Sequence, residues 1–221
     1  MKNILATIIL CALLQPLTAQ KIIEKHFSSA QSKVVSMNIQ IADSINVITW
    51  NKNEVYVKAS IDVNDNKNND AYKVNFDESN SSISIKSKFE FEKGKNCCGT
   101  DENCHCNCNC NSHITCVVYI PENTDFSVET IDGNISISGK TSQIRAHTIS
   151  GFIDISLNPE TKAGLRMKTI SGTMYSDFDF QSDKGLRHRG GSAIETLLNG
   201  GGDKSIDLET ISGDIFFRKQ S

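Results

Sequence analysis

The chain has 221 residues, of which 38% are hydrophobic, with three Pro and a formal net charge of −3. This composition is typical of a folded protein and excludes a disordered chain. The small negative charge argues against a strongly basic surface, so we expect neither nucleic acid nor an anionic membrane as a partner.

The N-terminus has the pattern of a secretory signal. A positive Lys2 precedes an apolar run over residues 4–14, and Ala19 ends a short exit segment. This run is shorter than the roughly twenty residues that span a bilayer. We therefore predict a signal peptide over residues 1–19, cleaved after Ala19, and no membrane span in the mature chain. The mature protein is expected to be secreted, either periplasmic or at the cell surface.

After a lead-in over residues 20–33, apolar and polar residues alternate in segment after segment. Alternating runs lie at residues 35–41, 45–47, 55–57, 61–63 and 83–91. Alternation of period two is the signature of strands with one buried face. The polar stretch from Trp50 to Asn53 predicts a turn between two of these strands. We therefore predict an all-β domain over residues 34–221.

A cysteine-rich insertion over residues 94–113 interrupts the alternating pattern. Seven of the eight cysteines lie in or beside it, and the eighth, Cys11, lies in the predicted signal. The cluster comprises Cys97, Cys98, Cys104, Cys106, Cys108, Cys110 and Cys116, with His105 and His113 among them. The insertion is expected to be a loop between two strands.

Two chemistries suit this cluster. An oxidising compartment favours disulfides, and we prefer pairings that involve Cys97, Cys98 or Cys116. The alternative is a soft-metal site for zinc or copper, with thiolates from Cys104, Cys106, Cys108 and Cys110 and imidazoles from His105 and His113. The usual two-residue spacing of a zinc knuckle is absent, so we expect no cofactor as the first interpretation.

The second half of the chain repeats one phrase. Its copies are ETIDGNI, HTISGFI, KTISGTM and ETISGDI, which begin at Glu129, His147, Lys168 and Glu209. The steps between these starts are 18, 21 and 41 residues, and the last step is interpreted as two ordinary steps with a degenerate copy between them. A unit of about twenty residues suits one turn of a β-solenoid or one long hairpin.

The columns of the repeat predict which residues face inward. Two inward columns are expected to flank the glycines: Ile131, Ile149, Ile170 and Ile211 before them, and Ile135, Ile153, Met174 and Ile215 after them. A third column follows by alternation at Ile137, Ile155 and Phe217. The threonines of the phrase are expected to form solvated outward ladders.

The four copies, the stretch INVITWNKNEVYV at residues 45–57 and the triple glycine at residues 200–202 resemble the DUF4097 family of adhesin-like β-repeat proteins. The resemblance covers roughly residues 34–218. It implies a right-handed, single-stranded β-solenoid or β-roll and a bacterial protein outside the cytoplasm. It implies no catalytic activity.

We expect no enzyme in this chain. Asp177, Asp179 and Asp183 could in principle cleave a glycosidic bond, but their alternation with phenylalanines indicates outward positions on a strand. The predicted function is a secreted, non-catalytic protein that presents an extended surface to a protein or an envelope component. The alternative is a metal-binding or redox loop carried on the same scaffold.

Overall fold

The computed structural model describes residues 20–28, 33–90, 111–179, 186–188 and 191–220. Within them it contains strands and one short 3-10 turn, which confirms the all-β prediction. The N-terminal elements are β1 (Lys21–Ser28), β2 (Val34–Trp50), β3 (Glu54–Val63), η1 (Asn69–Ala71), β4 (Tyr72–Glu78), β5 (Ser82–Phe89) and β6 (Ser112–Pro121). The repeat region holds β7 (Phe126–Ser138), β8 (Ile144–Ser150), β9 (Ile153–Leu157), β10 (Ala163–Ser171), β11 (Met174–Ser176), β12 (Leu186–His188), β13 (Gly191–Leu198), β14 (Ser205–Ser212) and β15 (Ile215–Lys219).

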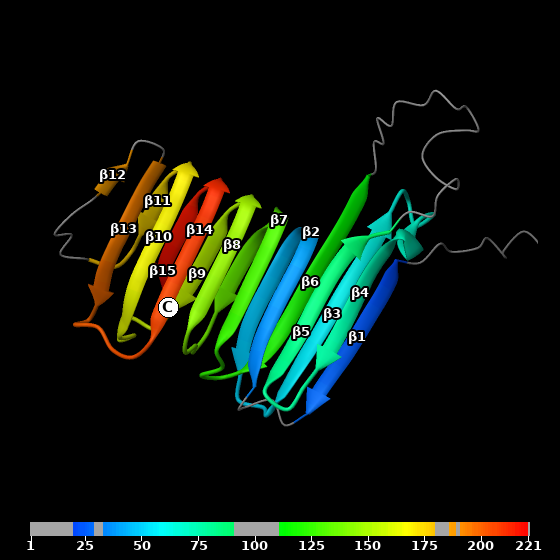
Figure 1. Ribbon diagram of the computed structural model, residues 1–221, viewed down its shortest axis with the longest axis horizontal. Coiled ribbons are helices and arrows are strands. Elements are labelled where there is room, and N and C mark those ends of the chain that lie inside the picture. Colours follow the sequence, from blue (N-terminus) through cyan, green and yellow to red (C-terminus); the bar gives the residue numbers. More distant parts are fainter. Residues whose placement is uncertain (1–19, 29–32, 91–110, 180–185, 189–190, 221) are drawn as a thin grey trace, which may run out of the picture.

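The strands form two facing layers (Figure 1). Hydrogen bonding is continuous between the layers because β2 and β7 are long and bend from one layer into the other. In the first layer the order is β4, β5, the first half of β2, the first half of β7, β8, β14, β10, β13 and β12. In the second layer the order is β1, β3, β6, the second half of β2, the second half of β7, β9, β15 and β11.

Each copy of the repeat forms one rung, which rises through the first layer, turns a corner at its glycine and returns through the second layer. The rungs are parallel to one another, so equivalent residues of neighbouring copies lie side by side. Glu129, His147, Glu209 and Lys168 align in this way across the first layer. A β-repeat architecture of rungs about twenty residues long therefore agrees with the sequence pattern.

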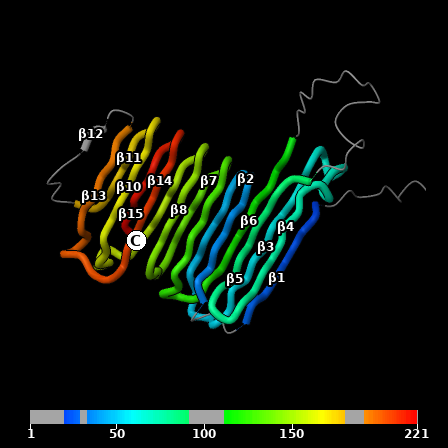
Figure 2. Tube along the Cα trace, viewed as in Figure 1, coloured from blue at the N-terminus to red at the C-terminus, as the bar shows by residue number. Residues whose placement is uncertain are grey.

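The rungs do not follow one another in chain order. The last copy, β14 and β15, lies between the second and third copies, where β14 pairs with both β8 and β10. Figure 2 shows this as a red segment between yellow-green and yellow ones. The interpretation of the 41-residue step as two ordinary rungs was wrong. The residues in between instead provide β12 and β13, which are antiparallel strands at the outer edge of β10.

The core lies between the two layers and consists of aliphatic columns. Ile135, Ile153 and Ile215 are fully buried, as are Ile155 and Phe217, which confirms the second and third predicted columns. Met174 is only half-buried because β11 is the edge strand of its layer. Each buried side chain is covered by the neighbouring rungs and by the opposite layer.

The N-terminal part closes the other end of the layers. Residues 21–28, expected as a lead-in, form edge strand β1, which pairs with β3. The predicted turn at residues 51–53 joins β2 to β3. No helix within the described parts of the chain is long and apolar enough to cross a membrane.

Candidate interaction surface

The corner of each rung has threonine inside and isoleucine outside. Thr148, Thr169 and Thr210 are completely buried, and Thr130 nearly so. The isoleucines that follow them are exposed: 48% for Ile131, 41% for Ile149, 46% for Ile170 and 37% for Ile211. The prediction that these isoleucines face inward and the threonines outward was therefore wrong. In the first-layer strand of each copy every second residue faces inward, up to and including the threonine. At the corner this pattern shifts by one residue.

The buried threonines bond to the glycines of neighbouring rungs. Thr148 Oγ1 donates to the Gly133 carbonyl at 3.2 Å, Thr210 Oγ1 to Gly151 at 3.1 Å, and Thr169 Oγ1 to Gly213 at 2.9 Å. A buried carbonyl at a corner needs such a donor, because leaving it unpaired costs about 1–3 kcal/mol. Isoleucine could not supply this hydrogen bond, which explains the choice of threonine inside.

Removal of one of these threonine hydroxyls tests how much its hydrogen bond contributes to stability. Thr148→Val should lower the free energy of unfolding by about 1–3 kcal/mol, because it removes the donor that the Gly133 and Ser150 carbonyls share, at 3.2 and 3.0 Å. Thr124→Val is the matched control, since the Thr124 hydroxyl is buried and has no hydrogen-bond partner among the described residues. This control should be neutral or stabilising. Urea unfolding of both variants checks the pair, and equal losses would contradict the role given to the Thr148 hydroxyl.

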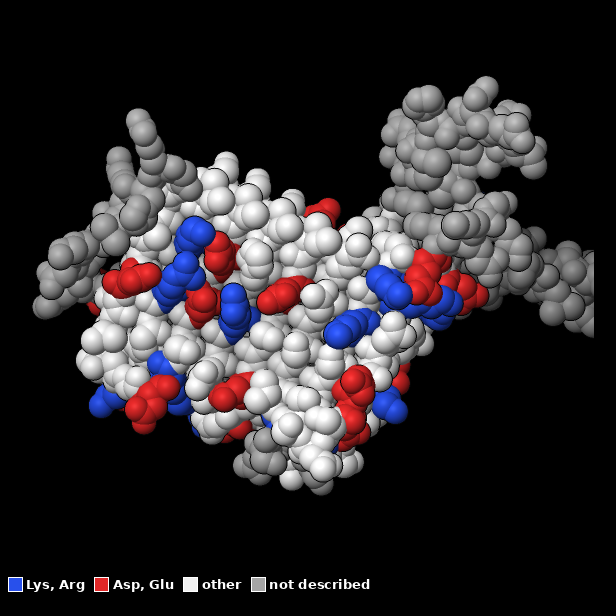
Figure 3. Space-filling view, viewed as in Figure 1, with Lys and Arg blue, Asp and Glu red and all other residues white. Residues whose placement is uncertain are grey.

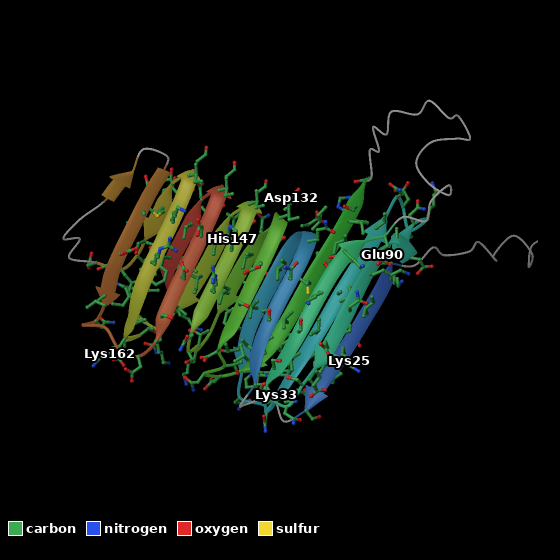
Figure 4. All side chains as sticks on the ribbon, viewed as in Figure 1. Lys25, Lys33, Glu90, Asp132, His147 and Lys162 are labelled. Atoms are coloured by element: carbon green, nitrogen blue, oxygen red, sulfur yellow. The ribbon has the colours of Figure 1, made fainter. Side chains whose placement is uncertain are left out.

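The exposed isoleucines form one continuous line, which we call the isoleucine row. In rung order it runs Ile131, Ile149, Ile211, Ile170, with neighbours on adjacent hydrogen-bonded strands. Adjacent strands lie about 4.8 Å apart, so the row is an apolar ridge along the corner edge. Asp132 lies beside it at the end of the first-layer strands (Figure 4). Phe152, which is 37% exposed, lies just past the corner of the second copy.

Below the row, the outer face of the first layer carries alternating charges. Arg166 Nη1 lies 2.8 Å from Asp207 Oδ1, and Lys168 Nζ lies 2.6 Å from Glu209 Oε1. Lys168 lowers the pKa of the Glu209 carboxyl through this hydrogen bond, and Arg166 contributes to the same effect. His147 lies on this face (Figure 4), and Figure 3 shows positive and negative side chains alternating along it. The face is polar and locally neutralised, in contrast to the row.

The second layer carries aromatic side chains on its outer face. At one end the Tyr175 and Phe216 rings are stacked with centroids 5.1 Å apart, and Arg218 lies over Phe216. At the other end Trp50, Tyr56 and Tyr119 form a cluster, with the Trp50 and Tyr119 centroids 4.9 Å apart. These residues alternate with buried valines and isoleucines, so their rings point away from the core.

The predicted sites in the cysteine-rich insertion lie mostly outside the described residues. This applies to Cys97, Cys98, Cys104, His105, Cys106, Cys108 and Cys110, so the disulfide and metal predictions stay predictions. His113 is on β6 and exposed, with Nδ1 3.4 Å from Asp43 Oδ2.

Cys116 differs from the rest of the predicted cluster. Among the described residues its thiol has no disulfide partner; it is buried between the layers, and burial raises its pKa to about 12. The preferred pairing through Cys116 stays a prediction, because Cys97 and Cys98 lie outside the described residues. Within the parts of the chain that the structure describes, no group of three or more His, Cys, Asp or Glu side chains could hold a metal ion.

The prediction that the aspartates after β11 face outward is confirmed for the two that the structure describes. Asp177 and Asp179 are exposed, while Phe178 between them is buried against Phe217. Asp183 lies outside the described residues. Sequence reasoning missed the isoleucine row, because it assigned isoleucine to the core by its hydrophobicity.

Bent parallel rungs in two layers define an all-β repeat protein. Residues 124–217 match the model of the Toastrack DUF4097 family, which confirms the predicted resemblance to that family. No curated protein matches the chain.

Two solved structures are similar. A candidate cell adhesion protein from Clostridium sporogenes ATCC 15579 has a TM-score of 0.52 and 11% identity, over 91% of this chain and 100% of that chain. A candidate adhesin from Bacteroides fragilis NCTC 9343 has a TM-score of 0.29 and 8% identity, over 90% of this chain and 97% of that one. The TM-score of the first structure indicates that it shares the fold of this chain.

Proposed function

We propose that this protein is a non-catalytic, adhesin-like binding protein that works outside the cytoplasm and contacts another envelope component. The observation that carries this proposal is the isoleucine row. Four large apolar side chains, 37–48% exposed, stand in consecutive rungs where a polar residue would serve the fold equally well. A contiguous apolar strip with polar margins is characteristic of a contact surface.

Two further observations support the proposal. The first 19 residues have the composition of a secretory signal, and the solved structure with a similar fold is described as a candidate cell adhesion protein. The charged face beside the row provides orientation, because ionic groups at the margin of an interface select partners more than they add affinity. The partner is a protein or an envelope component with a complementary apolar strip.

A variant with all four isoleucines of the row replaced by threonine tests this function. Threonine keeps the branched side chain that strands favour, so the fold should be retained. Binding of the purified protein to cell-envelope preparations, measured by co-sedimentation, should weaken by about tenfold or more, which corresponds to about 1.4 kcal/mol. The wild-type protein should bind saturably.

Leu197→Thr is the matched control, since Leu197 is 64% exposed on β13 but lies away from the row. This control should bind as the wild type does, and both variants should keep the wild-type melting temperature. Equal binding by the wild type and the row variant would refute the assignment of the row.

A further inference from the structure

A small pocket lies at the opposite end of the strands from the isoleucine row. Two turns form it side by side: residues 50–53, between β2 and β3, and residues 121–123, between β6 and β7. The Glu122 amide donates to the Trp50 carbonyl at 2.9 Å and holds the turns together. We call this site the turn pocket; the two turns that form it lie at the lower end of the strands in Figure 1.

The size of the turn pocket limits its ligand. Its volume is about 200 Å³, below the roughly 300–1,000 Å³ of pockets for drug-sized molecules. It is therefore suited to one ring-sized unit, such as the end of a longer chain that extends into solvent. The pocket is open at the surface, because Asn51, Lys52, Asn53 and Asn123 are all exposed.

The polar lining has the chemistry of a site for hydroxyl groups. Asn51, Asn53 and Asn123 each carry an amide that both donates and accepts hydrogen bonds, as a hydroxyl group does. Glu122 in the same lining is paired with Lys140, whose Nζ lies 3.6 Å from Glu122 Oε2, and Lys204 Nζ donates to Asn123 Oδ1 at 3.3 Å. With the carboxylate paired, the amides are the main groups that the lining offers, so the pocket fits a neutral group that is rich in hydroxyls.

The Trp50 indole provides an apolar wall that is held in place. Its Nε1 donates to the Glu54 carbonyl at 2.8 Å, and the Tyr119 ring packs against it. A ring fixed before binding loses little conformational freedom when a ligand arrives. Lys52 Nζ lies over the indole, 4.4 Å from the centre of the ring, so this face is covered by a cation and suits a positively polarised partner.

We propose that the turn pocket binds one neutral sugar unit of a glycan. The C–H groups of a sugar ring are positively polarised and would take the place of the Lys52 ammonium over Trp50, while its hydroxyls bond to the asparagines. Lys52 is an exposed, flexible side chain and moves aside at little cost. This inference deepens the proposed binding function by naming a ligand class at a site separate from the isoleucine row.

The chain contains a single tryptophan, so its fluorescence reports on this pocket alone. The full-length mature protein is titrated with glucose, galactose, N-acetylglucosamine and their β-linked disaccharides, up to about 50 mM, which covers weak single-unit binding. At least one sugar should give a saturable change in emission. Glucuronic acid should give no stronger response than glucose, because recognition is through hydroxyl groups.

Two variants complete the test. Asn51→Ala keeps the fluorophore and should weaken sugar binding at least fivefold without changing the melting temperature. Tyr175→Ala, at the distant aromatic stack, should leave sugar binding unchanged. The proposal is overturned if no sugar gives a saturable response, if Asn51→Ala binds as the wild type does, or if glucuronic acid is preferred.

The isoleucine row variant separates this inference from the proposed function. It should keep the sugar response while it loses envelope binding. A flat sugar titration together with a row-dependent loss of envelope binding would overturn the sugar proposal alone. A normal sugar response with envelope binding that does not depend on the row would overturn only the role of the row.

Discussion

Ile153→Asp should lower the free energy of unfolding by about 3–5 kcal/mol, because it places a carboxylate in the aliphatic core without a partner. Ile153 is fully buried in the second rung, between Ile135 and Ile215 on the neighbouring strands. Chemical denaturation followed by circular dichroism measures the loss. A variant too unstable to purify would agree with this expectation.

The matched control lies four residues earlier in the same rung. Ile149→Asp changes the same side chain at an exposed position of the isoleucine row, and it should cost under about 1 kcal/mol. Asp154→Asn, next to Ile153 but outward, should also have a small effect, since the Asp154 carboxylate is partly exposed and accepts from Arg218 Nε at 2.9 Å. Similar losses for Ile149→Asp and Ile153→Asp would refute the change of phase at the corner.

Gly172→Ala should destabilise the protein by about 3 kcal/mol, the upper part of the range for overpacking. A methyl group at Gly172 would lie 1.9 Å from the Gly213 carbonyl oxygen of the neighbouring rung. That oxygen belongs to the backbone and already accepts from Thr169 Oγ1, so it cannot move away without breaking the corner. The glycine column is needed because the corners of adjacent rungs touch.

Gly164→Ala is the control for this effect. Gly164 is the second residue of β10, and the nearest atom to an added methyl group would be 4.0 Å away. The substitution should be neutral or slightly stabilising, by up to about 1 kcal/mol, because alanine restricts the unfolded chain. Thermal melting of both variants distinguishes them, and a Gly172→Ala protein as stable as the control would contradict the close approach.

The strands were predictable because alternation is a local property of the sequence. The isoleucine row was missed although its signal was present. Two and four residues before each threonine stand apolar residues, such as Val128 and Phe126 before Thr130, and these are buried in phase with the threonine. Extending this phase from upstream would have placed threonine inside and isoleucine outside.

The order of the rungs could not be predicted from the sequence. The four copies present nearly the same pattern of Thr, Ile and Gly, so each would pair with any other at similar energy. Pairs across the last rung favour the observed order, such as Arg166 with Asp207 and Lys168 with Glu209. These pairs are 41 residues apart, and charge alternates too often in this sequence to identify them beforehand.

The position of the last rung has a consequence for how the protein is made. Strands β8 and β10 have no partner for their facing edges until β14 reaches the gap between them. A chain that is still being synthesised therefore exposes two unpaired strand edges, which are templates for aggregation. Strand pairing across the repeat region is complete only once β14 lies between β8 and β10, so this strand joins the two parts of the first layer into one sheet.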